Sequence, residues 1–476
     1  MFNSIEVEKA LGWRVFSIPS KEKEKILSEN ESRQIVALKN SKKVYLLRSI
    51  PELSVQEARM VRSILRSYQQ NIANFDISQC LKSYCEQNFL RLDSDQQEYI
   101  KLILDSATKP AGILCNLLED ERLEEIALIG LGKSKPVYVF DCAFGWLSTN
   151  IYFSQSEEVK RLINSMASTI GRRITLQHPK IDAMLPDGSR LNACIEPISI
   201  KGPQITIRKF KKNPLTATQL MRSGSMSASQ AAFLWMAMQS DCSILICGNT
   251  GSGKTTLLNS LFGFANQSER IVIVEDTPEI NIPHAHTVCL ASTEEIGVDS
   301  LVKNTLRMRP DRVVVGEMRT QSELGAFIDT LLAGQGKGSY ATFHAQSASE
   351  AVLRAIGMGT NPQDLCSLDL IITQKRWSVN FARSSSEQRK LTQICEVEYE
   401  KERAMLRELF SYDFSSQKFV KNEPSKKVAQ KICRAFKIEL KELDLELEAR
   451  EKFLLSLGEL KMEEFLDAIC TYQKNY

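Results

Sequence analysis

A glycine-rich loop carries the clearest chemical signal in this sequence. The apolar run SILIC leads directly into GNTGSGKTT at residues 248–256, and the helical pattern TTLLNSLFGF follows. Only residues without a Cβ let a backbone wrap around an anion and turn successive N–H groups inward. The spacing Gly-x4-Gly-Lys-Thr, in this order of strand, loop and helix, therefore predicts a triphosphate site. A chance match is expected in about one chain in a hundred of this length.

The positions of the loop have distinct expected roles. Lys254 supplies a positive charge for the β- and γ-phosphates, and Thr255 supplies a hydroxyl for Mg²⁺. The N-terminus of the following helix adds its partial positive charge. The predicted nucleotide-binding residues are Gly248, Asn249, Thr250, Gly251, Ser252, Gly253, Lys254, Thr255 and Thr256.

Two further strand-like runs end in carboxylates. IVIVEDTPE brings Glu275 and Asp276 to a strand end, and RVVVGEMR brings Glu317 to another. In open α/β sheets, ligands bind at the carboxyl ends of the strands. Hydrolysis of a phosphoanhydride needs one carboxylate near Mg²⁺ or its water and another that deprotonates the attacking water. The spacing leaves open which glutamate takes which role.

One histidine lies in a comparable position. His344 ends the strand-like run SYATFHA, after the two strands that carry the carboxylates. A lone histidine is more often structural than catalytic, but this context favours a sensor of the γ-phosphate. The other histidines, His178, His284 and His286, are interpreted as surface or structural residues.

The elements that must position these residues indicate an α/β fold. Between residues 215 and 395, the runs SILIC, IVIVED, RVVVGE, SYATFHA and LDLIIT alternate with helical patterns, which predicts a mostly parallel sheet with helices on both faces. Residues 1–110 are charged and predicted to be mostly helical, with helical spacing over 55–72. Residues 111–212 predict a small α/β domain that ends at a linker near Asn213, and residues 396–476 predict a hairpin followed by helices.

Composition excludes several classes of protein. The 61 Lys and Arg against 58 Asp and Glu leave a net charge of +3 over 476 residues, which argues against nucleic-acid binding. No run is long and apolar enough to span a bilayer and no secretory signal is seen, so a cytoplasmic protein is expected. The 12 cysteines form no CxxC pair, which favours reduced, mostly buried thiols over a zinc site.

Taken together, these motifs resemble the secretion ATPase superfamily, the hexameric motors of type II and type IV secretion, type IV pili and the archaellum. Its Walker A box matches GNTGSGKTTLLNS, its acidic box IVIVEDTPEI, its atypical Walker B box RMRPDRVVVGEMR and its His box GSYATFHAQSASEAVLR. The likeness runs from about residue 114 to the C-terminus. KPVYVFDCAFGWLSTNIYF and LEAREKFLLSLGELKMEEFLDAICTY look closest to the archaeal branch.

One position departs from the family pattern. The His box of the family usually opens with a histidine eight residues before the second one, and this chain has Gly336 there. A relay of two histidines is therefore not expected, although His344 is retained.

The resemblance implies a fold and a division of labour. It implies a RecA-like P-loop core at residues 215–395, a PAS-like N-terminal domain at 111–212, helical N- and C-terminal extensions, and ATP between the two domains. It makes Glu275 the residue that activates water and Glu317 the support for Mg²⁺. It also makes Arg190 and Arg208 the arginines that reach the γ-phosphate, in the same or a neighbouring subunit. Three arginines beside Walker B rank lower as candidates: Arg307, Arg309 and Arg319.

The resemblance also implies partners. It implies an ATP- and Mg²⁺-dependent homohexamer, peripheral at the inner face of the cytoplasmic membrane, that acts through a polytopic membrane platform protein. Pilin-like or secreted proteins would be its indirect substrates, and nucleic acid is not an expected partner. Two alternatives stay open: a RecA-like nucleic-acid translocase or conjugation-type motor, and a subunit that binds ATP without turning it over.

Overall fold

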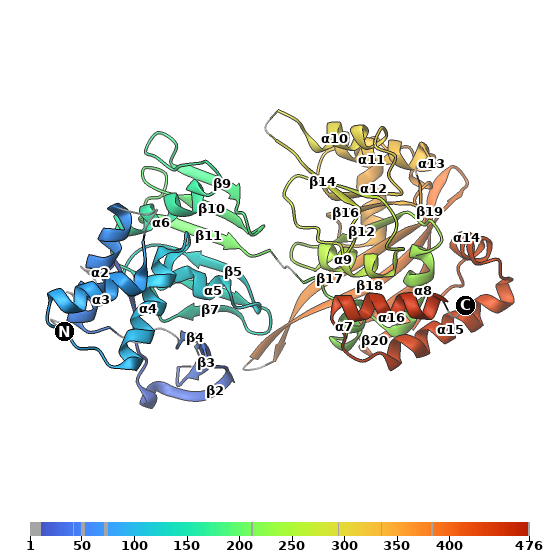
Figure 1. Ribbon diagram of the computed structural model, residues 1–476. Helices are drawn as coiled ribbons and strands as arrows, with labels where there is room; N and C mark the ends of the chain where they lie inside the picture. Colours follow the sequence, from blue (N-terminus) through green and yellow to red (C-terminus); the bar gives the residue numbers. More distant parts are fainter. Residues whose placement is uncertain are drawn as a thin grey trace. The chain divides into compact units, whose positions relative to one another are not determined.

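The computed structural model describes residues 11–40, 42–48, 53–70, 75–210, 213–293, 295–334, 336–381 and 384–474. The chain divides into two compact units, Met1–Phe210 and Lys211–Tyr476, and the division falls close to the linker predicted near Asn213. Figure 1 labels many of the elements of both units. Among the described helices, none combines the length and the apolarity that a bilayer span requires.

The second unit is built on one large sheet whose first part is parallel. In the order in which they pair, its parallel strands are β14 (Thr287–Ala291), β13 (Ile271–Glu275), β15 (Arg312–Met318), β16 (Ser339–Phe343), β12 (Ile244–Gly248) and β17 (Leu370–Phe381). Three antiparallel strands continue the sheet beyond β17: β18 (Ser384–Glu400), β19 (Arg403–Asp413) and β20 (Lys418–Lys421). The strand that precedes the glycine loop therefore lies in the interior of the sheet, between β16 and β17.

The parallel strands are apolar throughout because helices cover both of their faces. In β12, Ile244 and Ile246 pack into one core, while Leu245 and Cys247 pack into the other. The first core contains residues of α7 (Ala217–Arg222), α8 (Ala228–Met238), α9 (Lys254–Leu261), α14 (Lys427–Phe436), α15 (Leu440–Ser456) and α16 (Met462–Lys474). The second contains residues of α10 (Val298–Thr305), α11 (Gln321–Leu332), α12 (Ala348–Gly357) and α13 (Pro362–Leu365). The predicted α/β class, with a mostly parallel sheet between two helical layers, is confirmed.

Two buried carboxylates join the C-terminal helices to this sheet. The side chain of Glu396 on β18 accepts hydrogen bonds from the backbone N–H groups of Lys426, at 2.9 Å, and Val428, and so caps the start of α14. Asp369, just before β17, pairs with Lys431 at 2.7 Å. Because β18 begins well before residue 396, the predicted boundary between the ATPase domain and the C-terminal tail falls inside a strand. The hairpin belongs to the same sheet as the glycine loop.

The first unit contains a second large sheet. In pairing order its strands are β2 (Lys23–Glu29), β3 (Arg33–Leu38), β4 (Lys43–Leu47), β7 (Gly145–Thr149), β6 (Tyr138–Asp141), β5 (Leu123–Leu128), β11 (Gln204–Arg208), β10 (Arg190–Cys194) and β9 (Lys180–Met184). A separate pair is formed by β1 (Trp13–Val15) and β8 (Ile151–Phe153). The helices are α2 (Val55–Gln70), α3 (Ile77–Gln87), α4 (Ser94–Thr108), α5 (Cys115–Leu118) and α6 (Ser156–Ser168).

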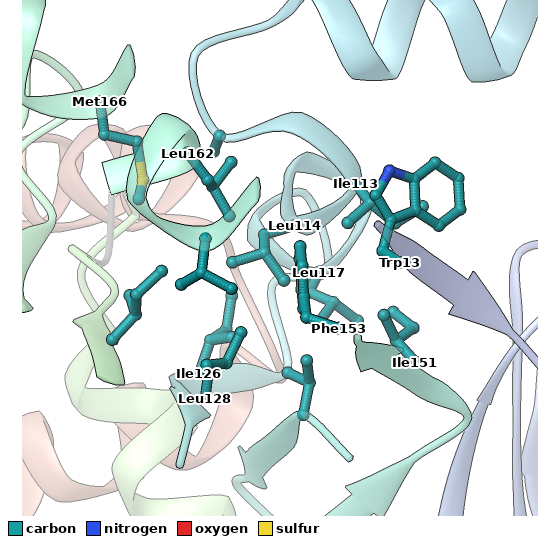
Figure 2. Close-up of a cluster of buried hydrophobic side chains, with 14 of the residues drawn as sticks. Trp13, Ile113, Leu114, Leu117, Ile126, Leu128, Ile151, Phe153, Leu162 and Met166 are labelled. Carbon is teal, nitrogen blue, oxygen red and sulfur yellow. The ribbon is translucent and has the colours of Figure 1, made fainter. Parts of the chain in front are cut away.

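The prediction of a mostly helical extension over residues 1–110 is wrong for residues 13–47, which carry β1 to β4. Strand β4 pairs with β7, so the N-terminal strands extend the sheet of the following α/β segment. In Figure 2, Trp13 lies beside Ile113 in the same buried cluster as Leu114 and Phe153. Charged residues interrupt the apolar alternation of β2 (KEKILSE), so this segment carries no strand signal. The helix expected over 55–72 is confirmed as α2, although residues 71–72 lie outside the described residues.

Candidate nucleotide site

The glycine loop has the geometry that its sequence predicts. It leaves the end of β12, and α9 begins at Lys254. Gly253, at the N-cap of α9, has φ +94°, a left-handed conformation that a side chain would strain. The loop therefore folds back on itself before the helix, and the N-terminal N–H groups of α9 stand at its end.

Lys254 lies inside the loop. Its side chain is buried, and Nζ donates hydrogen bonds to the carbonyl oxygens of Gly248 at 3.2 Å and Asn249 at 3.4 Å. The same Nζ is 3.9 Å from Oε1 of Glu317 on β15. The motif lysine and one of the two predicted glutamates therefore meet at the carboxyl edge of the sheet.

Glu317 is the centre of a small charged network. Its Oε1 is 2.6 Å from Nε2 of His344, which follows β16. Its Oε2 accepts a hydrogen bond of 2.8 Å from Nε of Arg319, whose Nη1 is 3.1 Å from Asp276. Lys254, His344 and Arg319 thus surround one carboxylate, and the sequence placed only the first two in the site.

A break in strand register aims Glu317 into this network. Strands β15 and β16 pair in register up to Val315, and the register shifts before Glu317, which lies opposite Thr342. A bulge of this kind re-aims the side chain that follows it, and bulges recur beside active sites. The carbonyl oxygen of Gly316, at the shift, accepts a hydrogen bond of 2.5 Å from Oγ1 of Thr342.

His344 is uncharged at pH 7 and donates a hydrogen bond to the Glu317 carboxylate. Burial and the nearby Lys254 lower the pKa of His344 below its usual value, although Glu317 acts in the opposite sense. The imidazole is therefore uncharged, and the contact with Glu317 is a hydrogen bond in which Nε2–H donates.

Glu275 is more deeply buried than Glu317. It ends β13 with 4% of its surface exposed, and its Oε1 accepts hydrogen bonds from the backbone N–H groups of Glu279 at 2.8 Å and Ile280 at 2.9 Å. Burial raises the pKa of Glu275 to about 7, against the effect of those two hydrogen bonds. A Cβ on Gly316 would lie 2.8 Å from Cγ of Glu275. Because Gly316, the residue before Glu317, has no side chain, the side chain of Glu275 has room beside it.

The two arginines expected from the N-terminal domain lie opposite each other. Arg190 on β10 pairs in register with Arg208 on β11, and Arg190 makes a two-pronged ion pair with Asp182 at 2.7 and 2.8 Å. Both residues belong to the first unit and the glycine loop to the second. Their contact with a nucleotide stays a prediction, as does a role for the exposed Arg307 and Arg309.

Sequence reasoning missed three features of this site. Arg319 binds Glu317, and its position two residues after that glutamate is the available signal. The motif alone does not predict that Gly316 makes room for Glu275. Asn249 was assigned to the loop, but its side chain also holds the backbone of Arg376 on β17, with N···O distances of 2.8 and 2.9 Å. No sequence pattern signals that contact, because 127 positions separate the two residues.

The backbone explains why Gly336 replaces the first histidine of the His box. Gly336 has φ +54°, and a Cβ at this position would lie 2.1 Å from the carbonyl oxygen of Asp311. A histidine here would be strained by the left-handed conformation and would collide with the backbone. The departure from the family pattern is thus part of a local turn that excludes side chains.

We expect Gly336→Ala to destabilise the second unit more than Gly334→Ala. Gly334 also has a left-handed conformation, φ +65°, but among the described residues other than its chain neighbours no atom lies within 4 Å of the position of its Cβ. In both variants an alanine must adopt a left-handed backbone conformation, which costs about 1–2 kcal/mol. Only Gly336→Ala also brings a Cβ into collision with the carbonyl oxygen of Asp311. Urea unfolding of the two variants measures the difference, expected to exceed about 1 kcal/mol. Equal losses would contradict the collision.

The raised pKa of Glu275 predicts a pH-dependent stability. The folded protein favours the protonated carboxyl, so the wild type loses stability as pH rises from about 4.5 to about 7, and no more above that. Relative to Glu275→Gln, the loss is expected to approach about 3 kcal/mol. Unfolding free energies of both proteins between pH 5 and 8 measure it. The exposed Glu295 provides the control, since Glu295→Gln should follow the wild-type profile. A constant difference between wild type and Glu275→Gln would contradict the account.

Several curated relatives match the chain in sequence. It is 44% identical over 221 residues to the uncharacterized protein MJ0781 of Methanocaldococcus jannaschii, a match that covers 44% of this chain and 30% of the relative. It is 33% identical to MJ0900 of the same organism, over 57% of this chain and 49% of the relative. The putative conjugal transfer protein Rv3659c of Mycobacterium tuberculosis is 32% identical, with 54% of this chain and 75% of the relative covered. The chain thus spans less than half the length of the first two.

Solved structures with similar chain traces include the Legionella pneumophila ATPase DotB and the pilus retraction motor PilT with bound ADP. The DotB match has 18% identity and a TM-score of 0.40, and it covers 75% of this chain and 94% of that one. The PilT match has 16% identity and a TM-score of 0.41, with 75% and 95% covered.

The model of one protein family matches residues 138–449, about two thirds of the chain. The matched range contains the glycine loop, both glutamates and His344. The chain therefore belongs to the family described as Type II/IV secretion system protein.

Proposed function

We propose that this protein is an Mg²⁺-dependent ATP hydrolase that drives a secretion, pilus or conjugation machine. One observation carries the proposal: Lys254, buried in the glycine loop, lies 3.9 Å from Glu317, and Glu317 in turn holds His344 at 2.6 Å. A cation, a carboxylate and a neutral imidazole therefore converge where the triphosphate of a P-loop protein ends.

The residues present fit Mg²⁺ and ATP. The Lys254 ammonium hydrogen-bonds carbonyl oxygens of the loop, which phosphate oxygens can replace as better acceptors. Ser252 Oγ is buried in the loop without a hydrogen-bond partner among the described residues. Thr255, in the first turn of α9, and Glu317 would hold the ion. When bound, Mg²⁺ neutralises the charge of the β- and γ-phosphates.

Glu275 has the properties of the general base. Two backbone N–H groups fix its Oε1, which orients Oε2. A pKa of about 7 lets the carboxylate take a proton from water and release it again near neutral pH. Glu317 is instead committed to Lys254, His344 and Arg319. These surroundings support the division of roles that spacing alone left open.

Arg190 and Arg208 are proposed to complete the site from the N-terminal domain of the same or a neighbouring subunit. Guanidinium groups stabilise the charge that spreads over the γ-phosphate oxygens during hydrolysis. The two arginines lie opposite each other on neighbouring strands, and Asp182 forms an ion pair with Arg190. A nucleotide bound in this way would link the two domains, so that hydrolysis would release them from each other.

The family and its named members support the biological role. A homohexamer at the inner face of the cytoplasmic membrane would pass the motion to a polytopic platform protein, and pilin-like or secreted proteins would be moved as a result. Relatives named conjugal transfer proteins, including TrbB of Sinorhizobium fredii at 33% identity, favour a conjugation-type motor as the second candidate. Stimulation of ATP hydrolysis by single-stranded DNA rather than by anionic vesicles would favour that candidate.

Lys254→Ala and Glu275→Gln test the catalytic site as a pair. Lys254→Ala should lose nucleotide binding, because the loop loses its buried cation. Glu275→Gln should bind ATP with wild-type affinity and lose at least about a hundredfold in kcat, because an amide cannot accept the proton. Calorimetric binding and phosphate release measure the two effects. Wild-type turnover by Lys254→Ala would contradict the proposed site, and loss of binding by folded Glu275→Gln would reassign that residue.

Arg190→Ala and Arg208→Ala should each lower kcat at least about tenfold without changing the fold. Asp182→Asn is the matched control for Arg190, since it breaks the same ion pair but keeps the guanidinium. Steady-state hydrolysis and thermal melting of the three variants give the comparison. If the arginine variants and the control have equal kcat, the arginines do not serve the reaction.

A further inference from the structure

Strand β17 runs past the end of β12 and along the glycine loop. Gly248, the last residue of β12, pairs with Gln374, so the rest of β17 extends beyond the sheet edge where the loop begins. The side chain of Asn249 accepts a hydrogen bond from the backbone N–H of Arg376 at 2.9 Å and donates one to its carbonyl oxygen at 2.8 Å. These two bonds hold the backbone of Arg376 beside the loop independently of the Arg376 side chain.

The guanidinium of Arg376 lies against the loop itself. A Cβ built on Gly251 would be 2.5 Å from Nη1 of Arg376, and Gly251 is exposed with φ +70°. Arg376 therefore occupies the space beside the middle of the loop that a side chain at position 251 would take. The same loop is predicted to present its N–H groups to phosphate.

A second arginine and a carboxylate of β18 lie beside Arg376. Arg389 on β18 lies directly opposite Arg376 in the strand pair, and Glu387 forms an ion pair with the Arg376 guanidinium. Like charges directly opposite each other destabilise a strand pair. A phosphate bound at the predicted loop would offer the Arg376 guanidinium an anionic partner in place of Glu387.

The strand order sets which part of a nucleotide Arg376 can reach. Glu317 and His344 belong to β15 and the end of β16, on one side of β12, whereas β17 lies on its other side. The catalytic groups and Arg376 therefore approach the loop from opposite sides. A cation on the side away from the catalytic groups would lie near the α- and β-phosphates, which ATP and ADP have in common.

We propose that Arg376 is a nucleotide-binding residue that contacts the α- and β-phosphates, and that Glu387 holds its guanidinium when no nucleotide is bound. This inference rests on the proposed function, since it assigns a further residue to the same site. It differs from the roles of Lys254 and Glu317, because the interaction is the same for ATP and ADP. Arg376 then contributes to affinity and leaves the chemical step unchanged.

Arg376→Gln in the full-length chain tests the proposal. The change removes the cation but keeps the backbone bonds to Asn249, so the loop retains its anchor. We expect ATP and ADP to bind at least about tenfold more weakly, with KM raised and kcat within about twofold of wild type. Lys375→Gln is the matched control, because Lys375 is the preceding residue of the strand and lies over the ring of Phe414. Its affinities should stay within about twofold of wild type.

Glu387→Gln provides an independent readout, since it removes the competing carboxylate but no part of the nucleotide site. ATP and ADP should bind about two- to threefold more tightly to this variant, and the gain should disappear in the double variant with Arg376→Gln. Thermal melting of each variant verifies the fold.

The outcomes separate the inference from the proposed function. Wild-type affinity of Arg376→Gln, alongside loss of binding by Lys254→Ala, would overturn the inference alone. A fall in kcat with unchanged ADP affinity would also overturn it, because Arg376 would then act at the γ-phosphate. Wild-type binding by Lys254→Ala would instead refute the proposed site, whatever Arg376→Gln does.

Discussion

The approach of Lys254 to Glu317, at 3.9 Å, is the interaction on which the site depends. It requires two strands of the same parallel sheet to end at one edge, with the glycine loop folded back over that edge. A largely buried ammonium needs compensating acceptors, and here the loop carbonyls and one carboxylate provide them. Binding of a polyanion would replace part of that compensation, so the balance of charges that stabilises the loop leaves it responsive to phosphate.

The sheet also determines what the other groups can do. The register shift at Gly316 aims Glu317 toward His344, and the missing side chain of Gly316 admits Glu275 on the neighbouring strand. Gly316 therefore positions Glu317 through the register shift and makes room for Glu275. This is a physical reason for a glycine directly before the glutamate at this strand end. Burial then separates the two acids: Glu275 acquires a pKa near 7, whereas cations and an imidazole surround Glu317.

Sequence predicted those parts of the structure whose signal is local. The loop at 248–256, the apolar strands with helices on both faces and α2 follow from spacing and periodicity, and Lys254, Glu317 and His344 do converge. Strand β2 has no local signal because charges interrupt its alternation, and the pairing of β1 with β8 and of β4 with β7 joins segments far apart in the sequence. Arg376 was missed for the same reason, since a bond to Asn249 across 127 positions leaves no local pattern. Gly336 could be noticed as a departure, but only the backbone shows the collision that explains it.

A crystal structure of the protein with Mg²⁺ and a non-hydrolysable ATP analogue tests the central claim most directly. We expect phosphate density along residues 249–253, with Lys254 Nζ moved from the Gly248 carbonyl oxygen to a phosphate oxygen and the ion beside Thr255 and Glu317. An unfilled loop at saturating analogue, with Lys254 still on Gly248, would contradict it. So would a nucleotide bound elsewhere in the chain.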